Sequence, residues 1–402
     1  MSIMGASVSG MNADTNWLST IAQNVANANT TGYKNVQTEF STLVDQSSNV
    51  TENVTGVTTS LRALNALQGS VVGTSTSTDL AVQGKGYFVV SDSSGALYLT
   101  RNGSFVPDAA GNLVNAAGYY LMGYNVQGGQ ANASANSLTG LQKVNVVTAG
   151  QAASATTAGA LTANLPSTNS ATAQYTDKTS MIAYDNLGGA HTIDIYLTKT
   201  GANTWESTAF DSSTAGPGGG FPYSSGPLAT QALTFSGTTG ALTGGSPFSI
   251  PVPNGQTMAL DLGQMTQLAT SFSVTAATAN GNPPGSSTGV SIARDGTLSF
   301  QFSNGATRPG YDIPLADVAS PDNMTSVNGD AFLANYNSGP AHVGTAGTGA
   351  FGTISSSSLE NSTVDIATEL TDMIQAQSAY QANSKVFQTG ADILQVLNGL
   401  KA

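Results

Sequence analysis

The N-terminus reads MSIMGASVSGMNADTNWLSTIAQNVANANTTGYK (residues 1–34), and its apolar residues recur at a helical spacing. Steps of four and three alternate along the stretch, which is the heptad pattern of a coiled-coil helix. The pattern stops at Asn29-Thr30-Thr31-Gly32, where a glycine is suited to end the helix. We therefore expect a helix whose apolar stripe consists of Met4, Val8, Met11, Leu18, Ile21 and Val25.

The C-terminus repeats this spacing over a longer stretch. Ser362 or Thr363 can cap a helix there, and the side chains of Asp365 and Glu369 suit the positive end of its dipole. The stripe that we expect on this second helix consists of Ile366, Leu370, Met373, Ile374, Tyr380, Phe387, Leu394 and Leu397.

The face opposite the N-terminal stripe is unusually neutral. From Met1 to Tyr33 the only ionised side chain is that of Asp14, whereas a solvated helix normally carries charges away from its apolar stripe. A neutral second face suits a helix that is covered on both sides. We expect the two terminal helices to pair in coiled-coil fashion and to become ordered on assembly. The alternative is that each helix packs into an ordinary core.

Between the ends, short apolar runs alternate with turn residues, as in a β-sandwich or a barrel. Residues 87–90, 97–99, 181–184 and 192–198 are runs of this kind. The pair Asp295-Gly296 predicts a β-hairpin with a type I′ turn, whose second strand directs Leu298, Phe300 and Phe302 to one face. The middle of the chain is therefore predicted to be β-structure.

Two segments of small and polar residues, 149–163 and 279–288, resemble exposed linkers. They predict a nested organisation, in which one β domain is inserted into another and both lie between the terminal helices. The fold class is mainly β with helical termini: paired coiled-coil-type helices and two nested β-sandwich or barrel-like domains. The expected domains are a helical domain (1–32 with 361–402), an extended arm (33–72), a discontinuous β domain (73–148 with 286–360) and an inserted outer β domain (149–285).

The composition excludes several classes of function. Of 402 residues, 11 are Lys or Arg and 23 are Asp or Glu, which gives a net charge of -12. Nucleic-acid binding is excluded because it needs clustered basic side chains. Cysteine is absent, so disulfide bridges and thiolate metal sites are excluded as well. No run of about 18 apolar residues predicts a membrane-spanning helix, and residues 1–17 lack the pattern of a cleaved secretory signal.

No candidate for catalysis, cofactor binding or metal binding stands out. Gly347-Thr348-Gly349-Ala350-Phe351-Gly352 has the glycine spacing of a dinucleotide site, but neither an apolar strand before it nor a helix after it is predicted. His191, near Asp185 and Asp194, is expected to lie on the surface beside a turn. The acidic residues are isolated and do not form a calcium loop. We expect no enzyme, no cofactor, no metal and no small-molecule substrate.

Several motifs resemble a known family. Residues 23–34 (QNVANANTTGYK) and 100–105 (TRNGSF), together with 118–124 and 360–370, are similar to the signatures of bacterial flagellar rod, hook and hook-associated proteins. The resemblance covers residues 1–125 and 340–402 well and the central region weakly. The motif residues are Asn24, Asn27, Asn29, Thr31, Gly32, Tyr33, Lys34, Arg101, Asn102 and Gly103.

The long central insertion is most similar to the hook subunits of this family, because rod proteins lack one. The resemblance implies a helical homopolymer that forms a curved, flexible tube and transmits torque from rod to filament. It also implies an extracellular location at the basal body and export without a cleaved signal peptide. The implied partners are further copies of the chain, the rod and hook–filament junction proteins, the hook cap and the flagellar export apparatus.

Two alternatives stay open on the sequence alone. A distal rod protein or a hook-associated protein is the nearest alternative within the family. A secreted β-rich adhesin is the alternative from another class, and it would need an aromatic surface patch. Trp205 with Tyr196 and Phe210 is the candidate for such a patch, although packing in a core explains these residues as well.

Overall fold

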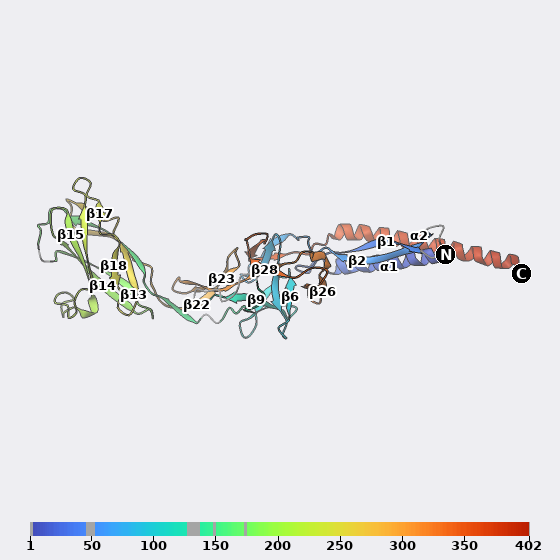
Figure 1. The fold of residues 1–402 in the computed structure, drawn as a ribbon, viewed down its shortest axis with the longest axis horizontal. Coiled ribbons are helices and arrows are strands. Elements are labelled where there is room, and N and C mark those ends of the chain that lie inside the picture. Colours follow the sequence, from blue (N-terminus) through green and yellow to red (C-terminus); the bar gives the residue numbers. More distant parts are fainter. Residues whose placement is uncertain (1–2, 46–52, 127–136, 148–149, 173–174, 402) are drawn as a thin grey trace. The chain divides into compact units, whose positions relative to one another are not determined.

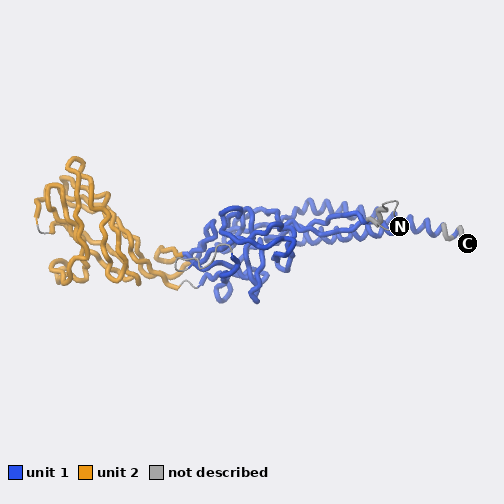
Figure 2. Tube along the Cα trace, in the orientation of Figure 1, with its two compact units in different colours: residues 1–148, 290–300, 309–402 blue, residues 149–289, 301–308 orange. Residues whose placement is uncertain are grey.

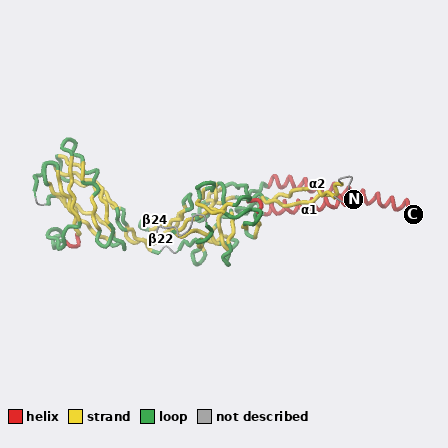
Figure 3. The backbone as a smooth tube through the Cα atoms, viewed as in Figure 1, coloured by secondary structure: helices red, strands yellow, loops and turns green. Residues whose placement is uncertain are grey.

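A computed structural model describes residues 3–45, 53–126, 137–147, 150–172 and 175–401. Helices lie at the two ends of the chain, and the described region between them consists mostly of strands and turns (Figures 1 and 3). The helices are α1 (Ile3–Ala26) and α2 (Ile366–Lys401). After α1, turns lead to Gly32, whose φ of 75° is a conformation that glycine adopts without strain. The predicted fold class, mainly β with helical termini, is confirmed.

The chain divides into two compact units (Figure 2). Unit 1 comprises Met1–Thr148, Val290–Phe300 and Pro309–Ala402, and unit 2 comprises Ala149–Gly289 and Gln301–Arg308. These units do not separate the terminal helices from the adjacent strands, so the finer division into helical domain, arm and β domains stays a prediction.

Within unit 1, α1 and α2 pack against each other and a long hairpin packs beside α1. The hairpin consists of β1 (Val36–Asp45) and β2 (Asn53–Ala63), which pair antiparallel with a register shift at Leu43/Val44. It lies in residues 33–72, for which the sequence predicts an extended arm. Asn16 Nδ2 on α1 donates a hydrogen bond to Thr59 Oγ1 on β2 (2.9 Å). The hairpin is therefore held to the helix pair by side-chain contacts.

The remaining strands of unit 1 surround a separate core, to which Tyr87, Val89, Leu99 and Phe332 contribute. The central strand β5 has buried side chains on both faces, so it reads as a continuous apolar run. The strands are β3 (Val71–Gly73), β4 (Leu80–Gln83), β5 (Tyr87–Ser91), β6 (Leu97–Thr100), β7 (Phe105–Pro107), β8 (Leu113–Asn115), β9 (Tyr120–Asn125), β10 (Leu141–Lys143), β25 (Pro314–Asp317), β26 (Thr325–Val327), β27 (Ala331–Leu333), β28 (His342–Thr345), β29 (Thr353–Ser356) and β30 (Ser358–Glu360).

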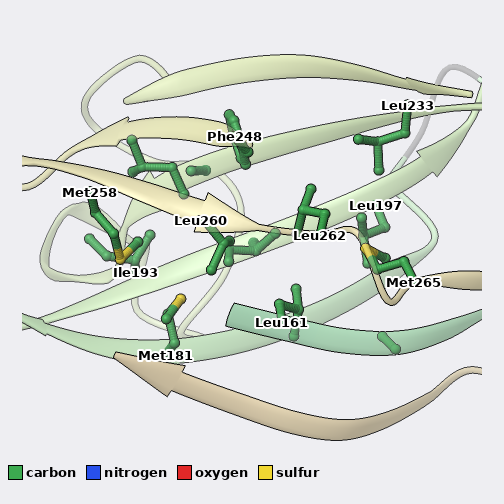
Figure 4. Close-up of a cluster of buried hydrophobic side chains, with 14 of the residues drawn as sticks. Leu161, Met181, Ile193, Leu197, Leu233, Phe248, Met258, Leu260, Leu262 and Met265 are labelled. Carbon is green, nitrogen blue, oxygen red and sulfur yellow. The ribbon is translucent and has the colours of Figure 1, made fainter. Parts of the chain in front are cut away.

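Unit 2 contains two five-stranded sheets that enclose one apolar core (Figure 4). The first sheet has the order β13-β14-β15-β16-β17, and β18, β19, β12, β20 and β21 form the second. Strand β19 alternates exposed and buried side chains, the pattern of a strand with one face on a core. The strands are β11 (Gln151–Ser154), β12 (Ala158–Pro166), β13 (Asp177–Tyr184), β14 (Ala190–Lys199), β15 (Thr204–Asp211), β16 (Ala229–Phe235), β17 (Leu242–Gly244), β18 (Phe248–Pro251), β19 (Thr257–Asp261), β20 (Thr266–Leu268) and β21 (Ser273–Ala279).

Three strands have residues in both units: β22 (Asn282–Ile292), β23 (Thr297–Phe302) and β24 (Thr307–Asp312). The predicted hairpin at Asp295-Gly296 is confirmed, since β22 and β23 are neighbours in the sheet. The predicted turn type is wrong. Gly296 N–H donates to the Ala293 carbonyl and only the glycine of the pair has a positive φ (91°), which is a type I turn followed by a glycine bulge.

The linkers predicted over 149–163 and 279–288 are also wrong. The described part of the first segment contains β11 and the start of β12, and the second contains the start of β22. Ala152 on β11 pairs with Gly285 on β22, and Gly159 on β12 pairs with Ala279 on β21. The prediction failed because the small side chains of these segments form no alternating pattern. The strands with which they pair lie more than a hundred residues away in the sequence.

Candidate assembly interface

The helices α1 and α2 run antiparallel and meet along a seam of small and polar residues. Asn24 Nδ2 donates to Glu369 Oε1 (3.0 Å), and Asn383 Nδ2 donates to Asp14 Oδ2 (2.8 Å). Both carboxylates are buried, and a buried charge is costly unless it is hydrogen-bonded. The buried positions of the two helices are Ser7, Gly10, Ala13, Asp14, Thr20, Ile21 and Asn24 on α1 and Glu369, Ala376 and Gly390 on α2.

The seam leaves no room for a side chain at Gly10. A Cβ atom at this position would lie 2.7 Å from Asn383 Nδ2, which is closer than van der Waals contact allows. The absence of a side chain therefore lets Asn383 reach Asp14, one turn further along α1.

Part of the apolar stripe that the sequence predicts lies outside this seam. Exposed fractions of 40% for Val8, 47% for Leu370 and 66% for Ile374 put these side chains on the outer surface of the helix pair. Of the predicted set, Ile21 is buried; Met4, Met11, Leu18, Val25, Met373 and Phe387 are partly buried; Val8, Ile366, Leu370, Ile374, Tyr380 and Leu394 are exposed; and the side chain of Leu397 lies outside the described residues.

Six of the fourteen predicted residues are thus exposed on a helix pair that is already formed, and the role of the set as an assembly interface stays a prediction. The heptad spacing identified the apolar positions correctly but could not identify which surface covers them. The seam buries the polar side chains of Asn24, Asp14 and Glu369 because each is hydrogen-bonded to a residue of the other helix. A hydrophobicity pattern does not detect such pairs.

The motif residues converge on one buried carboxylate, that of Glu360. Lys34 Nζ forms an ion pair with Glu360 Oε1, and Arg101 Nη1 forms one with Oε2 (3.0 Å). Lys34 also donates to the Leu67 carbonyl, and Arg101 Nη2 donates to the Gly84 carbonyl (2.8 Å). Burial lowers the pKa of the Lys34 ammonium and outweighs the opposing effect of Glu360. Three segments far apart in the sequence are therefore tied together by one acidic side chain.

Two motif glycines permit the close approach of these segments. Gly32 N–H donates to the Glu360 carbonyl (2.8 Å), and a Cβ at Gly32 would lie 2.7 Å from the backbone nitrogen of Asn102. A Cβ at Gly103 would lie 1.7 Å from the Leu80 carbonyl oxygen. Any side chain at Gly103 would therefore displace the backbone of β4.

Asn24 and Tyr33 close the turn that follows α1. Asn24 Oδ1 accepts hydrogen bonds from Tyr33 Oη (3.2 Å) and from the Val36 backbone nitrogen (3.1 Å). Asn27 Nδ2 donates back to the Gln23 carbonyl, and Asn102 Oδ1 accepts from the Ser104 backbone nitrogen. Asn29 is exposed and Thr31 is partly buried. The motif residues thus build the junction between helices and β-structure.

Glu360 and Asn383 are structural residues to which the sequence assigned no individual role, and Glu369 was considered only as a favourable charge at the start of the second helix. A signal existed for Glu360, which is the only acidic or basic residue between Asp330 and Asp365 apart from His342. Lone charges in a neutral stretch are often paired in the fold. Asn383 offered no signal, because asparagine is common throughout the chain.

The other residues considered from the sequence form no site together. His191 Nε2 lies 3.3 Å from Asp185 Oδ2, whose carboxylate accepts the Gly189 and Leu187 backbone N–H groups of a turn. The Gly347–Gly352 segment connects β28 to β29 as a loop. In the part of the chain that the structure describes, no cluster of three His, Asp or Glu side chains could hold a metal ion.

The aromatic candidates in unit 2 are packed inside it. Trp205 is 1% exposed, and its Nε1 donates to Gln267 Oε1 (3.1 Å). Tyr196 and Phe210 are buried, and both contact Phe221, which is 49% exposed, and Tyr223. The three residues that the sequence offered for an aromatic surface patch, Trp205, Tyr196 and Phe210, are therefore all buried. Neither described helix is long and apolar enough to cross a membrane.

Four segments match described protein families. Residues 4–34 match the flagella basal body rod protein family, and residues 81–162 match the flagellar hook protein FlgE/F/G D1 domain. Residues 154–282 match the flagellar basal body protein FlaE D2 domain, and residues 355–400 match the flagellar basal body rod FlgEFG protein C-terminal family. The matched segments include both helices and most of the described strands.

Curated relatives match over nearly the full length. The flagellar hook protein FlgE of Brucella abortus biovar 1 (strain 9-941) is 44% identical over 403 residues, covering 99% of this chain and 98% of the relative. That of Escherichia coli (strain K12) is 31% identical over 412 residues, covering 98% of each chain. A crystal structure of Helicobacter pylori flagellar hook protein FlgE2 is similar to 70% of this chain and 98% of its own, with 14% identity and a TM-score of 0.49.

Identity that extends through the inserted region, and not only through the ends shared with rod proteins, distinguishes a hook subunit from the alternatives. The chain belongs to the family of flagellar hook proteins, FlgE, and is a structural subunit of the bacterial flagellum.

Proposed function

We propose that this hook subunit polymerises through the exposed apolar stripes of α1 and α2, and that the polymer is a curved, flexible tube that transmits torque from rod to filament. The observation that carries the proposal is the exposure of the stripe: Leu370 is 47% and Ile374 66% exposed on a helix that already has a partner. A contiguous apolar surface in water favours association.

The energy available from this surface is sufficient for assembly. Full burial of a Leu or Ile side chain contributes about 1.5–3 kcal/mol. Six predicted stripe residues, namely Val8, Ile366, Leu370, Ile374, Tyr380 and Leu394, are between 40% and 66% exposed. Covering them in a polymer therefore offers several kcal/mol per subunit before the cost of immobilising the subunit.

The low charge of the subunit supports a flexible polymer. Charged residues make up 8% of the chain. Contacts between apolar, Ser, Thr, Asn and Gly side chains lack strong ion pairs, so neighbouring registers differ little in energy and subunits slide as the tube bends. We assign the inner tube to residues 1–32 with 361–402, the intermediate layer to 73–148 with 286–360, and the outer layer to 149–285.

We further propose that the subunit contacts the rod and the hook–filament junction proteins, and the hook cap during assembly. Export through the flagellar export apparatus without a cleaved signal peptide is part of this proposal, and the match of residues 4–34 to the flagella basal body rod protein family supports it. The location of the polymer is then the extracellular hook attached to the basal body.

Leu370→Asp and Ile374→Asp test the proposal, because a charge in the stripe opposes burial without touching the α1–α2 seam. Gln375→Asp adds the same charge at an exposed polar position of α2 and serves as the control. In negative-stain electron microscopy, the unaltered protein and the control should form curved tubes, whereas the stripe variants should remain monomeric with unchanged circular dichroism. Normal tubes from both stripe variants would refute the interface, and straight tubes from the unaltered protein would indicate a rod protein.

A further inference from the structure

A groove in unit 1 lies between α1, strand β1 and the first turns of α2. It encloses about 310 Å³. Trp17 and Phe40 line it with aromatic rings that meet edge to face, 5.6 Å between centroids and 87° between planes. Glu369 and Asp372 line it from α2 with carboxylates. Phe40 is 46% exposed, so the groove opens to the surface of the unit.

The carboxylates in this groove are incompletely satisfied. Glu369 is 5% exposed, and both hydrogen bonds that it accepts, from Asn24 Nδ2 and Asn35 Nδ2, fall on Oε1 (3.0 and 2.9 Å). No described residue donates to Glu369 Oε2 or forms an ion pair with Asp372. Two carboxylates and two aromatic rings that line one groove are a favourable environment for an ammonium group, through charge and cation–π attraction.

We propose that this groove binds the ammonium group of Lys385 from a second copy of the chain. The inference rests on the proposed self-assembly through the terminal helices and names one contact within it. Among the side chains that the structure describes on α1 and α2, Lys385 is the only cation, it is exposed, and it forms no ion pair. Its charge complements that of the groove, which carries Glu369 and Asp372.

A chain cannot fill its own groove. Asp372 and Lys385 are 13 positions apart on one helix, which corresponds to about 20 Å along the axis and about 140° around it. Donor and acceptor therefore lie on different faces of α2. An interface between two different faces is heterologous, and it repeats from copy to copy into a ring or an open helical polymer instead of closing as a symmetric dimer.

Zero-length carbodiimide cross-linking tests this contact directly. Polymers grown from equal amounts of unlabelled and ¹⁵N-labelled protein should yield peptides in which Lys385 is joined to Asp372 or Glu369, with one peptide of each isotope. The separation of about 20 Å within one chain excludes an intramolecular product. Cross-links from Lys385 only to other carboxylates, or none from Lys385, would overturn the proposal.

Charge reversal provides a second test. Lys385→Glu and Asp372→Lys should each raise the critical concentration for polymerisation about five- to tenfold, as expected for the loss of a partly buried ion pair. The double variant should restore it to within about twofold of the unaltered protein, because the pair is re-formed with the charges exchanged. Asp392→Lys, at an exposed position of the same helix, should have little effect.

The outcomes separate this inference from the proposed function. Polymers of normal critical concentration from Lys385→Glu would overturn the Lys385 contact and leave assembly through the stripe intact. Two defective single variants without rescue in the double variant would also refute the pairing. If the unaltered protein forms no polymer, the proposed function fails and this inference fails with it.

Discussion

Glu360 shows how much of the fold depends on single side chains. Its carboxylate is fully buried and pairs with Lys34 and Arg101, which lie 326 and 259 positions away in the sequence. Its backbone carbonyl accepts the Gly32 N–H group. Removing one partner of a buried ion pair destabilises a protein far more than replacing both partners by apolar residues, because the remaining charge is left uncompensated.

Glu360→Gln should therefore lower the free energy of unfolding of unit 1 by about 3–5 kcal/mol. The matched control is Glu39→Gln, which removes an ion pair with Arg62 in which both side chains are 52% exposed, and its effect should be much smaller because exposed ion pairs contribute little to stability. Native-state hydrogen exchange at the Val89 amide in the unit 1 core reports both values. Equal effects of the two substitutions would show that the buried cluster is not a structural centre.

The ionised carboxylate of Asp194 makes the stability of unit 2 dependent on pH in the acidic range. Burial would raise the pKa of this carboxyl, but hydrogen bonds from Ser180 and Tyr223 and the nearby Lys178 ammonium outweigh burial and lower the pKa below its usual value of 3.8. A carboxyl with a lowered pKa in the folded state stabilises the fold above the unfolded-state value. That stability is lost as the pH falls from about 4 through the folded-state pKa.

Asp194→Asn should therefore flatten the fall in stability of unit 2 below about pH 4. The chain has two tryptophans, and Trp205 lies in the core of unit 2, so thermal unfolding followed by its fluorescence in a Trp17→Phe background isolates this unit. An unchanged slope of melting temperature against pH in the Asn variant would contradict the assignment.

At the scale of whole elements, the helix pair depends on side chains that are absent or small. The seam contains Gly10, Ala376 and Gly390, and the hydrogen bond between Asn383 and Asp14 needs the space beside Gly10. Larger residues there would separate α1 from α2. The carboxylates of Asp14 and Glu369 would then lose hydrogen bonds across the seam.

Gly10→Val should consequently remove protection from hydrogen exchange along α1 and the facing part of α2, while unit 2 stays protected. Ala6→Val introduces the same side chain at an exposed position of α1 and should leave protection unchanged. Full protection of α1 in the Gly10 variant would mean that the seam tolerates a wider spacing than the Asn383–Asp14 bond implies.

The elements themselves could largely be predicted, whereas their contacts could not. Heptad spacing predicts both helices, and short apolar runs between turn residues predict strands such as β5, β6 and β14. Strand β11 (QAAS) has no such run, and its conformation depends on backbone pairing with β22. The seam was missed for a similar reason: Asn24 and Glu369 are polar, and only the folded chain brings them within 3.0 Å of each other. The candidate assembly residues were found by their apolarity, and their exposure is a property of the fold.

At the scale of the whole molecule, the two units have separate cores. Both five-stranded sheets of unit 2 lie between Ser154 and Asn282 in the sequence. These two residues are partners in the antiparallel β11–β22 ladder. A two-residue Asn-Gly turn closes an antiparallel pair of strands without strain. The inserted region can therefore be removed at a point where the two chain ends already meet.

A variant in which an Asn-Gly turn replaces residues 155–281 should fold and polymerise, because the stripe and the seam lie entirely in unit 1. Its tubes should differ in curvature and bending stiffness from those of the unaltered protein, measured from their contours in electron micrographs. A variant that is unfolded by circular dichroism would show that unit 1 needs unit 2 to fold.

The seam also determines when, during translation, α1 can form its contacts with α2. Asp14 and Asn383 are 369 positions apart, and Asn24 and Glu369 are 345 apart. A ribosome that adds about 5–20 residues per second needs roughly 20–75 seconds to cover that distance. Throughout this interval α1 and the β1–β2 hairpin beside it have been translated but α2 has not, so Asp14 and Asn24 lack their hydrogen-bond partners. Most of the stability of a helix in a protein comes from tertiary packing. The first element to be made is thus among the last to complete its contacts.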